Sequence, residues 1–109
     1  MNVRELSGVP LQRVEFCRRK VGIVPQSGGV YVISNYFESV LYIGLSKNLQ
    51  SRILQHLNHE QKLELTPEGR AYWFHYKLCS EKELRPDERG WLLHYQLHEG
   101  RLPYFNKIG

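Results

Sequence analysis

The sequence predicts an α+β fold in which a small, mainly antiparallel three-stranded sheet is flanked by helices. Two runs of β-branched and aromatic residues, 29–33 and 40–44, stand on either side of a polar segment, and this arrangement indicates a β-hairpin. Aliphatic residues then recur every four positions through 49–57, which is the spacing of an amphipathic helix. Alternating aromatic residues through 70–78 predict the third strand.

Length and composition bound the class of protein. The chain of 109 residues is expected to form a single domain, 1–109, with a modest core and an N-terminal lead-in segment over 1–28. Its net charge of +4 is compatible with a nucleic-acid partner, and the basic excess before residue 29 fits either a basic patch or an ordinary solvated surface. The two cysteines, Cys17 and Cys79, lack zinc-site spacing and favour a reduced, intracellular, cytoplasmic setting. No apolar run indicates a signal sequence or a membrane span.

The N-terminal segment predicts a short helix and an extended connector. Pro10 suits the first position of a helix, and Leu11 and Val14 would then lie on one of its faces. Pro25 disfavours helix in the residues before it, so we expect 21–25 to be extended.

The hairpin predicts which side chains share a face of the sheet. Folded symmetrically about Tyr36 and Phe37, it sets Tyr31 opposite Tyr42, because successive side chains of a strand alternate between the two faces. The other face suits a core and collects four aliphatic residues, Val30, Val32, Leu41 and Ile43. The face with the two phenols does not need to be buried.

Two helices are predicted after the hairpin. Ser46 suits the N-cap of the first helix. Its buried stripe consists of Leu49, Ile53 and Leu57. A polar stripe beside it consists of Asn48, Arg52 and His56. The second helix is expected over 86–98, with Pro86 at its start and its end before Gly100, and a single helical turn over 80–84 precedes it.

The hairpin and the first helix also carry a motif. Without it, these elements fit an ordinary half-buried hairpin followed by an amphipathic helix. Gly29-Val30-Tyr31, ten intervening residues, and Tyr42-Ile43-Gly44 together resemble the paired motif of the GIY-YIG nucleases. Arg52 follows at the spacing of that family's arginine, His56 stands four residues further on, and Lys47-Asn48-Leu49 resembles the family's lead-in to this helix.

A carboxylate on the second predicted helix extends the resemblance. Glu88 shares a helical face with the apolar residues Trp91, Leu92 and Tyr95, where an uncompensated carboxylate is costly. Taken alone, an acidic residue here also fits the first turn of a helix, where the backbone dipole favours it. The resemblance favours a functional role, because the family has a glutamate followed by an aliphatic pair, a proline and an asparagine, matched here by Glu88, Leu92-Leu93, Pro103 and Asn106.

The resemblance implies metal-dependent cleavage of a phosphodiester bond. Glu88 would hold one divalent cation, Mg²⁺ or Mn²⁺, since magnesium takes one or two protein carboxylates and leaves its other positions to water and phosphate. Arg52 would stabilise the charge on the phosphate through its planar fork of donors. Tyr31 and Tyr42 would position the attacking water. The resemblance assigns Tyr31 as the proton acceptor, a role that requires a phenol pKa well below the usual ~10.

Three further residues complete the expected site. His56 would either assist proton transfer or hold a phosphate. Lys47 and Asn106 are the substrate-binding candidates, with Lys47 on a phosphate and Asn106, in an extended tail over 102–106, bracing the site by hydrogen bonds. An exposed loop lysine and a residue of a chain-end loop are the ordinary alternatives for these two.

Together these features predict a DNA endonuclease whose site lies on the sheet face that bears Tyr31 and Tyr42. The sequence shows no helix-turn-helix, zinc finger or long basic tail, so we expect weak or structure-specific nicking, or a partner protein for targeting. Two alternatives stay open. One is a non-catalytic nucleic-acid-binding module of the same fold, and the other is a protein-interaction domain in which Trp73, Trp91 and the tyrosines form an exposed patch.

Overall fold

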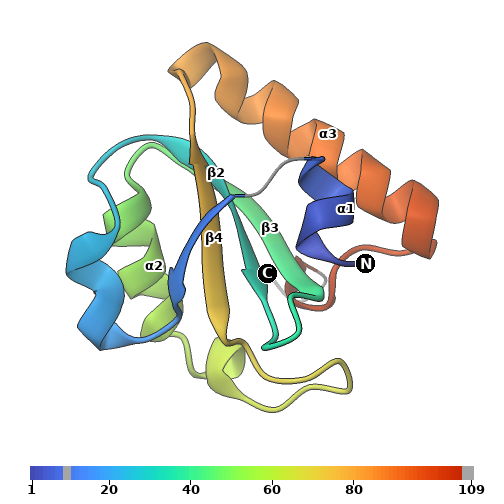
Figure 1. The fold of residues 1–109 in the computed structure, drawn as a ribbon, viewed down its shortest axis with the longest axis horizontal. Coiled ribbons are helices and arrows are strands. Elements are labelled where there is room, and N and C mark those ends of the chain that lie inside the picture. Colours follow the sequence, from blue (N-terminus) through green and yellow to red (C-terminus); the bar gives the residue numbers. More distant parts are fainter. Residues whose placement is uncertain (9–10, 107–109) are drawn as a thin grey trace.

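The computed structural model describes residues 1–8 and 11–106 and contains a four-stranded sheet with helices on both sides (Figure 1). The elements in chain order are α1 (Val3–Ser7), β1 (Gln12–Glu15), η1 (Arg18–Ile23), β2 (Gly29–Ser34), β3 (Val40–Ser46), α2 (Leu49–Leu57), η2 (Glu60–Leu63), β4 (Trp73–Leu78), α3 (Glu81–Glu99) and η3 (Tyr104–Asn106). The η elements are short 3₁₀ helices. Within the described ranges, no helix combines the length and the apolar character needed to cross a membrane.

The strand order is β1-β4-β2-β3, and every neighbouring pair is antiparallel. The predicted α+β class with an antiparallel sheet is confirmed, but the predicted number of three strands is wrong. The fourth strand is β1, where we expected a helix; the predicted start of that helix at Pro10 lies outside the described residues. β1 pairs with β4 in the register that sets Arg13 opposite His75, and the Arg13 guanidinium lies 3.8 Å from the centre of the Trp73 ring.

The β2–β3 hairpin is not symmetric, so the predicted cross-strand pair of tyrosines is wrong. Tyr31 lies opposite Gly44, and Tyr42 lies opposite Ile33. Glu38 adopts a left-handed φ of 69° in the turn, and the register shifts between Ile33 and Ser34. These two irregularities displace β3 along β2. The two tyrosines still share a face of the sheet, with their ring centroids 5.9 Å apart.

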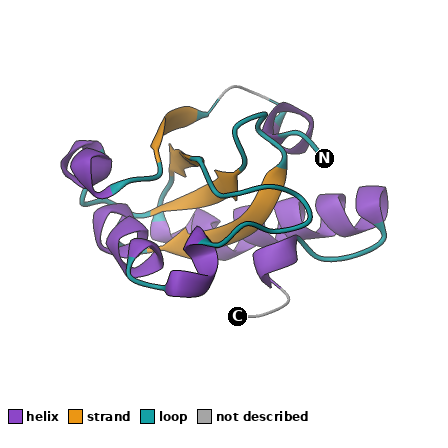
Figure 2. Cartoon of the chain, turned by 90° about the horizontal axis from the view of Figure 1, so that it is seen from below, coloured by secondary structure: helices purple, strands orange, loops and turns teal. Residues whose placement is uncertain are grey.

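Both faces of the sheet are buried, because α2 covers one and α3 covers the other (Figure 2). The predicted apolar stripe of α2 packs beside Tyr31 in one cluster, with Leu49, Ile53 and Leu57 almost fully buried. Tyr95 of α3 packs against Val32 and Ile43 in the other cluster. The expectation that the tyrosine face needs no burial is therefore wrong, since Tyr31 is 0% exposed.

The helix caps differ from the predicted ones. α3 begins at Glu81 and passes through Pro86, because Ser80 and Glu83 form a capping box in which the Ser80 backbone N–H donates to Glu83 Oε1 over 3.1 Å. Its end at Gly100, with a left-handed φ of 74°, is as predicted. The N-cap of α2 is Asn48 and not Ser46, since the Asn48 side chain accepts from the Ser51 N–H.

Candidate functional site

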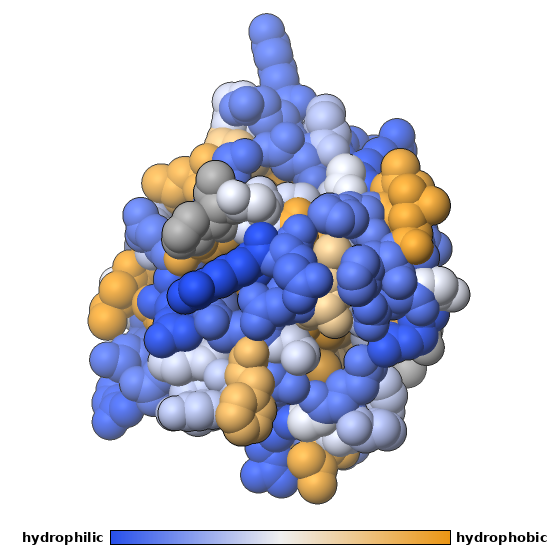
Figure 3. Space-filling model, turned by 45° about the vertical axis from the view of Figure 1, so that its right-hand side comes forward, coloured by the Kyte–Doolittle hydropathy of each residue, from blue (hydrophilic) through white to orange (hydrophobic). Residues whose placement is uncertain are grey.

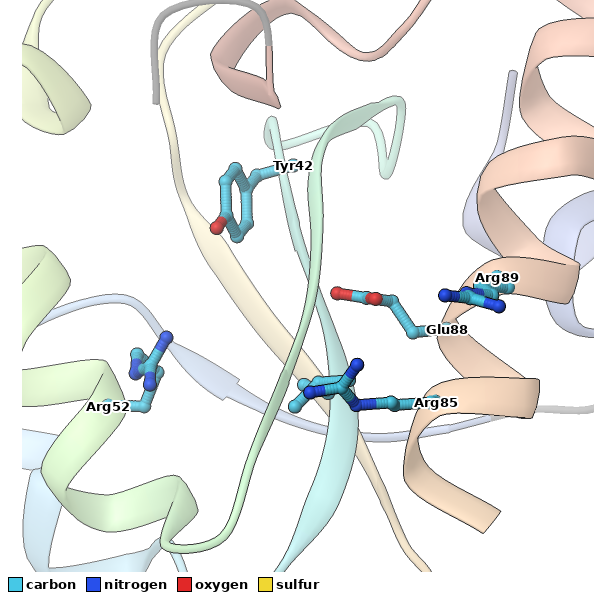
Figure 4. A pocket seen from close by; sticks show the side chains of 6 residues that line it. Tyr42, Arg52, Arg85, Glu88 and Arg89 are labelled. Atoms are coloured by element: carbon cyan, nitrogen blue, oxygen red, sulfur yellow. The ribbon is translucent and has the colours of Figure 1, made fainter.

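A cavity of about 340 Å³ lies beside β3, which is one of the two edge strands of the sheet. It is lined by Tyr42, Leu45, Arg52, Arg85, Glu88 and Arg89. In Figure 4, β3 passes between α2, which carries Arg52, and α3, which carries Glu88. The expected position on one face of the sheet is thus wrong: α2 and α3 cover opposite faces, so their side chains meet only where the sheet ends.

Tyr31 and His56 form a buried pair behind Tyr42. The Tyr31 hydroxyl lies 2.7 Å from His56 Nε2, and the Tyr31 ring stacks on Phe74 with a centroid distance of 5.0 Å. Burial and the neighbouring Tyr42 raise the pKa of Tyr31, which the Arg52 charge opposes only in part. Burial, with the charges of Lys62 and Arg52, lowers the pKa of His56 to about 3.

These two pKa shifts define the state of the pair at neutral pH. The phenol keeps its proton and the imidazole is neutral, and the donor in this hydrogen bond depends on the histidine tautomer: the Tyr31 O–H donates to Nε2 when the histidine proton is on Nδ1, and Nε2–H donates to Oη in the other tautomer. The resting protein does not show the lowered phenol pKa that a proton-accepting Tyr31 requires. A neutral His56 does not act as a phosphate-binding cation, and the same lowered pKa makes its imidazole a weak proton acceptor.

Steric crowding requires glycine at both motif positions, Gly29 and Gly44. A Cβ atom added to Gly44 would lie 2.6 Å from both Cζ and Oη of Tyr31 and 2.9 Å from Cε1 of Tyr42. A Cβ added to Gly29 would collide with the backbone oxygen of Lys77 on β4 and lie 2.8 Å from Leu49 Cδ1. Gly44 therefore lets the Tyr31 ring cross the edge strand, and Gly29 lets β2 approach its neighbours closely.

Glu88 is half-buried in the cavity and is unpaired. It forms no hydrogen bond or salt bridge with any of the described residues. Burial raises the pKa of its carboxyl group, and the charges of Arg85 and Arg89 oppose that shift. The carboxylate oxygens are thus free to bind a hard cation such as Mg²⁺. No cluster of three or more acidic, histidine or cysteine side chains suited to a metal occurs in the described part of the chain, so such a cation would rely on water and phosphate for its other ligands.

Asn106 and Lys47 lie outside the cavity. Asn106, in η3, pairs with the β3 backbone: its Oδ1 accepts from the Ile43 N–H and its Nδ2 donates to the Ile43 carbonyl, each over 2.9 Å. The Lys47 side chain is 79% exposed, forms an ion pair with Glu81 over 3.3 Å and lines a different cavity of about 200 Å³. Its position separates it from the charged groups around Glu88.

Of the seven predicted site residues, Tyr42, Arg52 and Glu88 line the cavity, and Tyr31 and His56 lie directly behind them. The prediction missed Arg85 and Arg89. A signal for them exists in the sequence, because they stand three residues before and one residue after Glu88 on the same helix.

Comparisons with known proteins agree with this geometry. A family model described as the GIY-YIG catalytic domain matches residues 27–89, which include all the residues that line the cavity. Two curated proteins, each named UvrABC system protein C, are similar over shorter segments. The one from Wolbachia sp. subsp. Brugia malayi is 36% identical over 53 residues, and the one from Methanosphaera stadtmanae is 42% identical over 41 residues. These segments are 49% and 38% of this chain but only 9% and 7% of the two relatives.

Solved structures show the same fold. The GIY-YIG N-terminal endonuclease domain of UvrC from Thermotoga maritima, bound to magnesium as its catalytic divalent cation, has a TM-score of 0.58 and 24% identity. The match covers 82% of this chain and 93% of that one. A point mutant of the same domain, also bound to its catalytic divalent cation, has a TM-score of 0.58 and 23% identity, over 81% of this chain and 91% of that one.

Proposed function

The chain belongs to the GIY-YIG family of catalytic domains, and we propose that residues 1–109 act as one metal-dependent endonuclease domain that hydrolyses phosphodiester bonds of DNA. One observation carries the proposal: Glu88 is an unpaired carboxylate in a cavity whose other charged groups are arginines. A site that only binds phosphate gains nothing from this carboxylate, because it repels the phosphate unless a cation lies between them. The non-catalytic binding module is therefore the weaker alternative.

Glu88 would hold a single divalent cation, Mg²⁺ or Mn²⁺. When bound, such a cation neutralises charge at the phosphate and lowers the pKa of a coordinated water. The Thermotoga maritima domain supports this choice, since it is described with a catalytic divalent cation, in one case magnesium. Manganese is proposed because it accepts the same oxygen ligands as magnesium.

Arg52 and Tyr42 would act directly on the substrate. Arg52 reaches the cavity from α2, and its guanidinium matches the geometry of a phosphate and keeps its charge at any working pH. It would stabilise the charge that develops in the transition state. The Tyr42 side chain lines the same cavity and would orient the attacking water.

Tyr31 and His56 would move the proton of that water. Tyr31 accepts this proton on Oη only as its own O–H proton passes to His56 Nε2, 2.7 Å away. The water becomes a hydroxide nucleophile, and the imidazole becomes an imidazolium, which requires the negative charge of the bound phosphate to offset the Lys62 and Arg52 charges that lower the pKa of His56. This relay explains how a tyrosine with a raised pKa can accept a proton without existing as a phenolate in the resting protein.

A plasmid-nicking assay tests the proposal. The wild-type protein should nick supercoiled DNA with Mg²⁺ or Mn²⁺ and not with EDTA. Glu88→Gln should abolish nicking, and Arg52→Ala should slow it by roughly 10²–10³-fold, the usual effect of losing one charge-stabilising group. Asp87→Asn is the matched control, because Asp87 precedes Glu88 on α3 but pairs with Lys77 over 3.3 Å and does not line the cavity; it should nick like the wild type.

Two outcomes would overturn the proposal. Nicking that survives in Glu88→Gln would exclude this carboxylate as the metal ligand. A wild-type protein that binds plasmid, branched and single-stranded DNA but cuts none of them would favour the binding module.

We further propose an intracellular, cytoplasmic setting and a partner protein for targeting. Cys17 and Cys79 are free thiols, as expected in a reducing compartment. The protein-interaction alternative has partial support: Trp91 is half-buried against the core and Arg13 covers one side of Trp73, but the exposed rings of Tyr36 and Tyr72 pack with Trp73. On the face seen in Figure 3, apolar side chains lie in small separate groups among hydrophilic ones.

A further inference from the structure

Two arginines of α3 have no role in the function proposed above. Arg85 and Arg89 are exposed residues four positions apart, one helical turn, and both line the cavity around Glu88. Neither forms a hydrogen bond or a salt bridge with any residue in the described ranges. In Figure 4 they flank Glu88 on the α3 side of β3, while Arg52 comes from α2 on the other side.

Among the acidic residues of α3, the lack of a partner is specific to Glu88. Every other acidic residue of α3 has a partner: Glu81 pairs with Lys47, Glu83 with Ser80, Asp87 with Lys77, and Glu99 with the N-terminal amino group. Only the acidic residue that lines the cavity is left without one, although two arginines stand close enough to oppose the rise in its pKa. Ordinary helix-surface ion pairing, which is worth a few tenths of a kcal/mol per pair, does not explain the arrangement.

The charges of the cavity favour an anion with more than one negative group. Three guanidinium groups, those of Arg52, Arg85 and Arg89, face one carboxylate. The sum of formal charges is +2, from three positive groups and one negative group. One phosphate facing Arg52 leaves the α3 pair of arginines unneutralised, whereas a nucleic-acid strand presents a row of phosphates.

We propose that Arg85 and Arg89 form a second phosphate-binding arm, in which each arginine contacts a separate phosphate on the α3 side of the one that faces Arg52, so that the bound strand crosses the free edge of β3 from α2 to α3. The inference rests on the proposed function, because it takes the phosphate at Arg52 to be the scissile one. It adds the path of the strand and two residues that contact the substrate away from the bond that breaks.

The two arginines of the arm should also affect how tightly Glu88 binds a divalent cation. In the absence of DNA, the charges of Arg85 and Arg89 repel a divalent cation from Glu88, and phosphates on the arm remove that repulsion. Metal and DNA should therefore bind with positive coupling, and each should raise the affinity for the other by the same factor. Removing the arm should strengthen metal binding to the free protein while it weakens DNA binding.

The test is the salt dependence of DNA binding, measured by fluorescence anisotropy in EDTA, where no cutting occurs. Each phosphate contact contributes about 0.9 to the slope of log K against log salt for duplex DNA and about 0.7 for a single strand. Arg85→Gln and Arg89→Gln should each make this negative slope shallower by about that amount, and the double variant should make it shallower by about twice as much. Lys82→Gln is the control, because Lys82 is exposed on the same helix and does not line the cavity.

A second measurement excludes misfolding as the cause. Mn²⁺ binding to the DNA-free protein, followed by electron paramagnetic resonance, should be several-fold tighter in the double variant than in the wild type or in Lys82→Gln, a gain that a damaged fold does not produce. Slopes equal to that of Lys82→Gln, or Mn²⁺ binding unchanged in the double variant, would overturn the inference. A wild type that binds DNA with the expected slopes but never cuts it would sink the endonuclease proposal and leave the phosphate arm standing.

Discussion

Replacing Gly44 with alanine tests the packing on which the whole site depends. The new methyl carbon would lie 2.6 Å from Cζ and Oη of Tyr31 and 2.9 Å from Cε1 of Tyr42, whereas ordinary contact begins at 3.4 Å. Tyr31 has no free space into which it can move, because its ring stacks on Phe74 and its hydroxyl is bonded to His56. The added atom must therefore displace either the edge strand or the buried pair.

The cost follows from the usual effect of overpacking a core, about 1–3 kcal/mol. In a domain of this size each 1 kcal/mol lowers the thermal midpoint by about 4–8 °C, so Gly44→Ala should melt roughly 4–24 °C below the wild type. Nicking should fall by more than the loss of folded protein explains, since the displaced groups are Tyr31 and Tyr42 themselves. Thermal unfolding followed by circular dichroism, with nicking measured well below both midpoints, separates the two effects.

Gly90→Ala should have the opposite effect on stability. A Cβ at Gly90 meets nothing within 4 Å, and the residue lies inside α3, where alanine is favoured over glycine by roughly 0.5–1 kcal/mol. This variant should melt above the wild type and keep its activity. If Gly44→Ala melts at or above the wild type, the Tyr31 ring does not cross Gly44 as described and the steric argument for the motif glycine fails.

Three further outcomes are expected. Mg²⁺ at ten times its Kd should stabilise the wild type by about 1.4 kcal/mol in thermal scans and leave Glu88→Gln unchanged; equal shifts in both would place the cation elsewhere. The free energy of unfolding, measured by urea titration, should fall as the pH drops below about 6.5. Burial lowers the pKa of His56 to about 3 and that of His75 to about 4, so over this range the unfolded chain binds protons that the folded chain does not. Each histidine should lower the free energy of unfolding by up to about 1.4 kcal/mol per pH unit. His56→Gln should flatten that dependence, and an unchanged slope would contradict it. Asn106→Ala should destabilise the protein by about 1–3 kcal/mol and speed hydrogen exchange at the Ile43 amide, which loses its acceptor; unchanged exchange would show that another group covers this edge.

The features that the sequence predicted well depend on contacts within one element. The buried stripe of α2 needs only helical spacing, and the strand predicted within 70–78, which is β4, needs only the alternation of its aromatic residues. The end of α3 at Gly100 needs only a residue that tolerates a positive φ. Each of these can be read from a window of a few residues, because the physical cause lies inside that window.

The features that the sequence missed depend on partners far along the chain. β1 is a strand because β4, some 60 residues later, offers it hydrogen bonds and the Trp73 ring for Arg13. The hairpin register depends on one left-handed residue, Glu38, and on the register shift between Ile33 and Ser34, which no residue type at these positions predicts. Only some of the charged residues of the cavity were predicted, because the cavity brings together residues that are far apart in the sequence. Resemblance supplied Glu88, while no motif in the sequence pointed to Arg85.

The position of the site at the sheet edge follows from the strand order. Because β3 has a neighbour on one side only, side chains from α2 and α3 can reach the same space although the two helices cover opposite faces. An exposed edge strand normally invites pairing with other chains, and here Asn106 occupies the backbone groups of Ile43 beside Tyr42. The edge is therefore blocked against another strand at this point while its side chains stay open to a phosphate backbone, which does not pair with strand amides in a ladder.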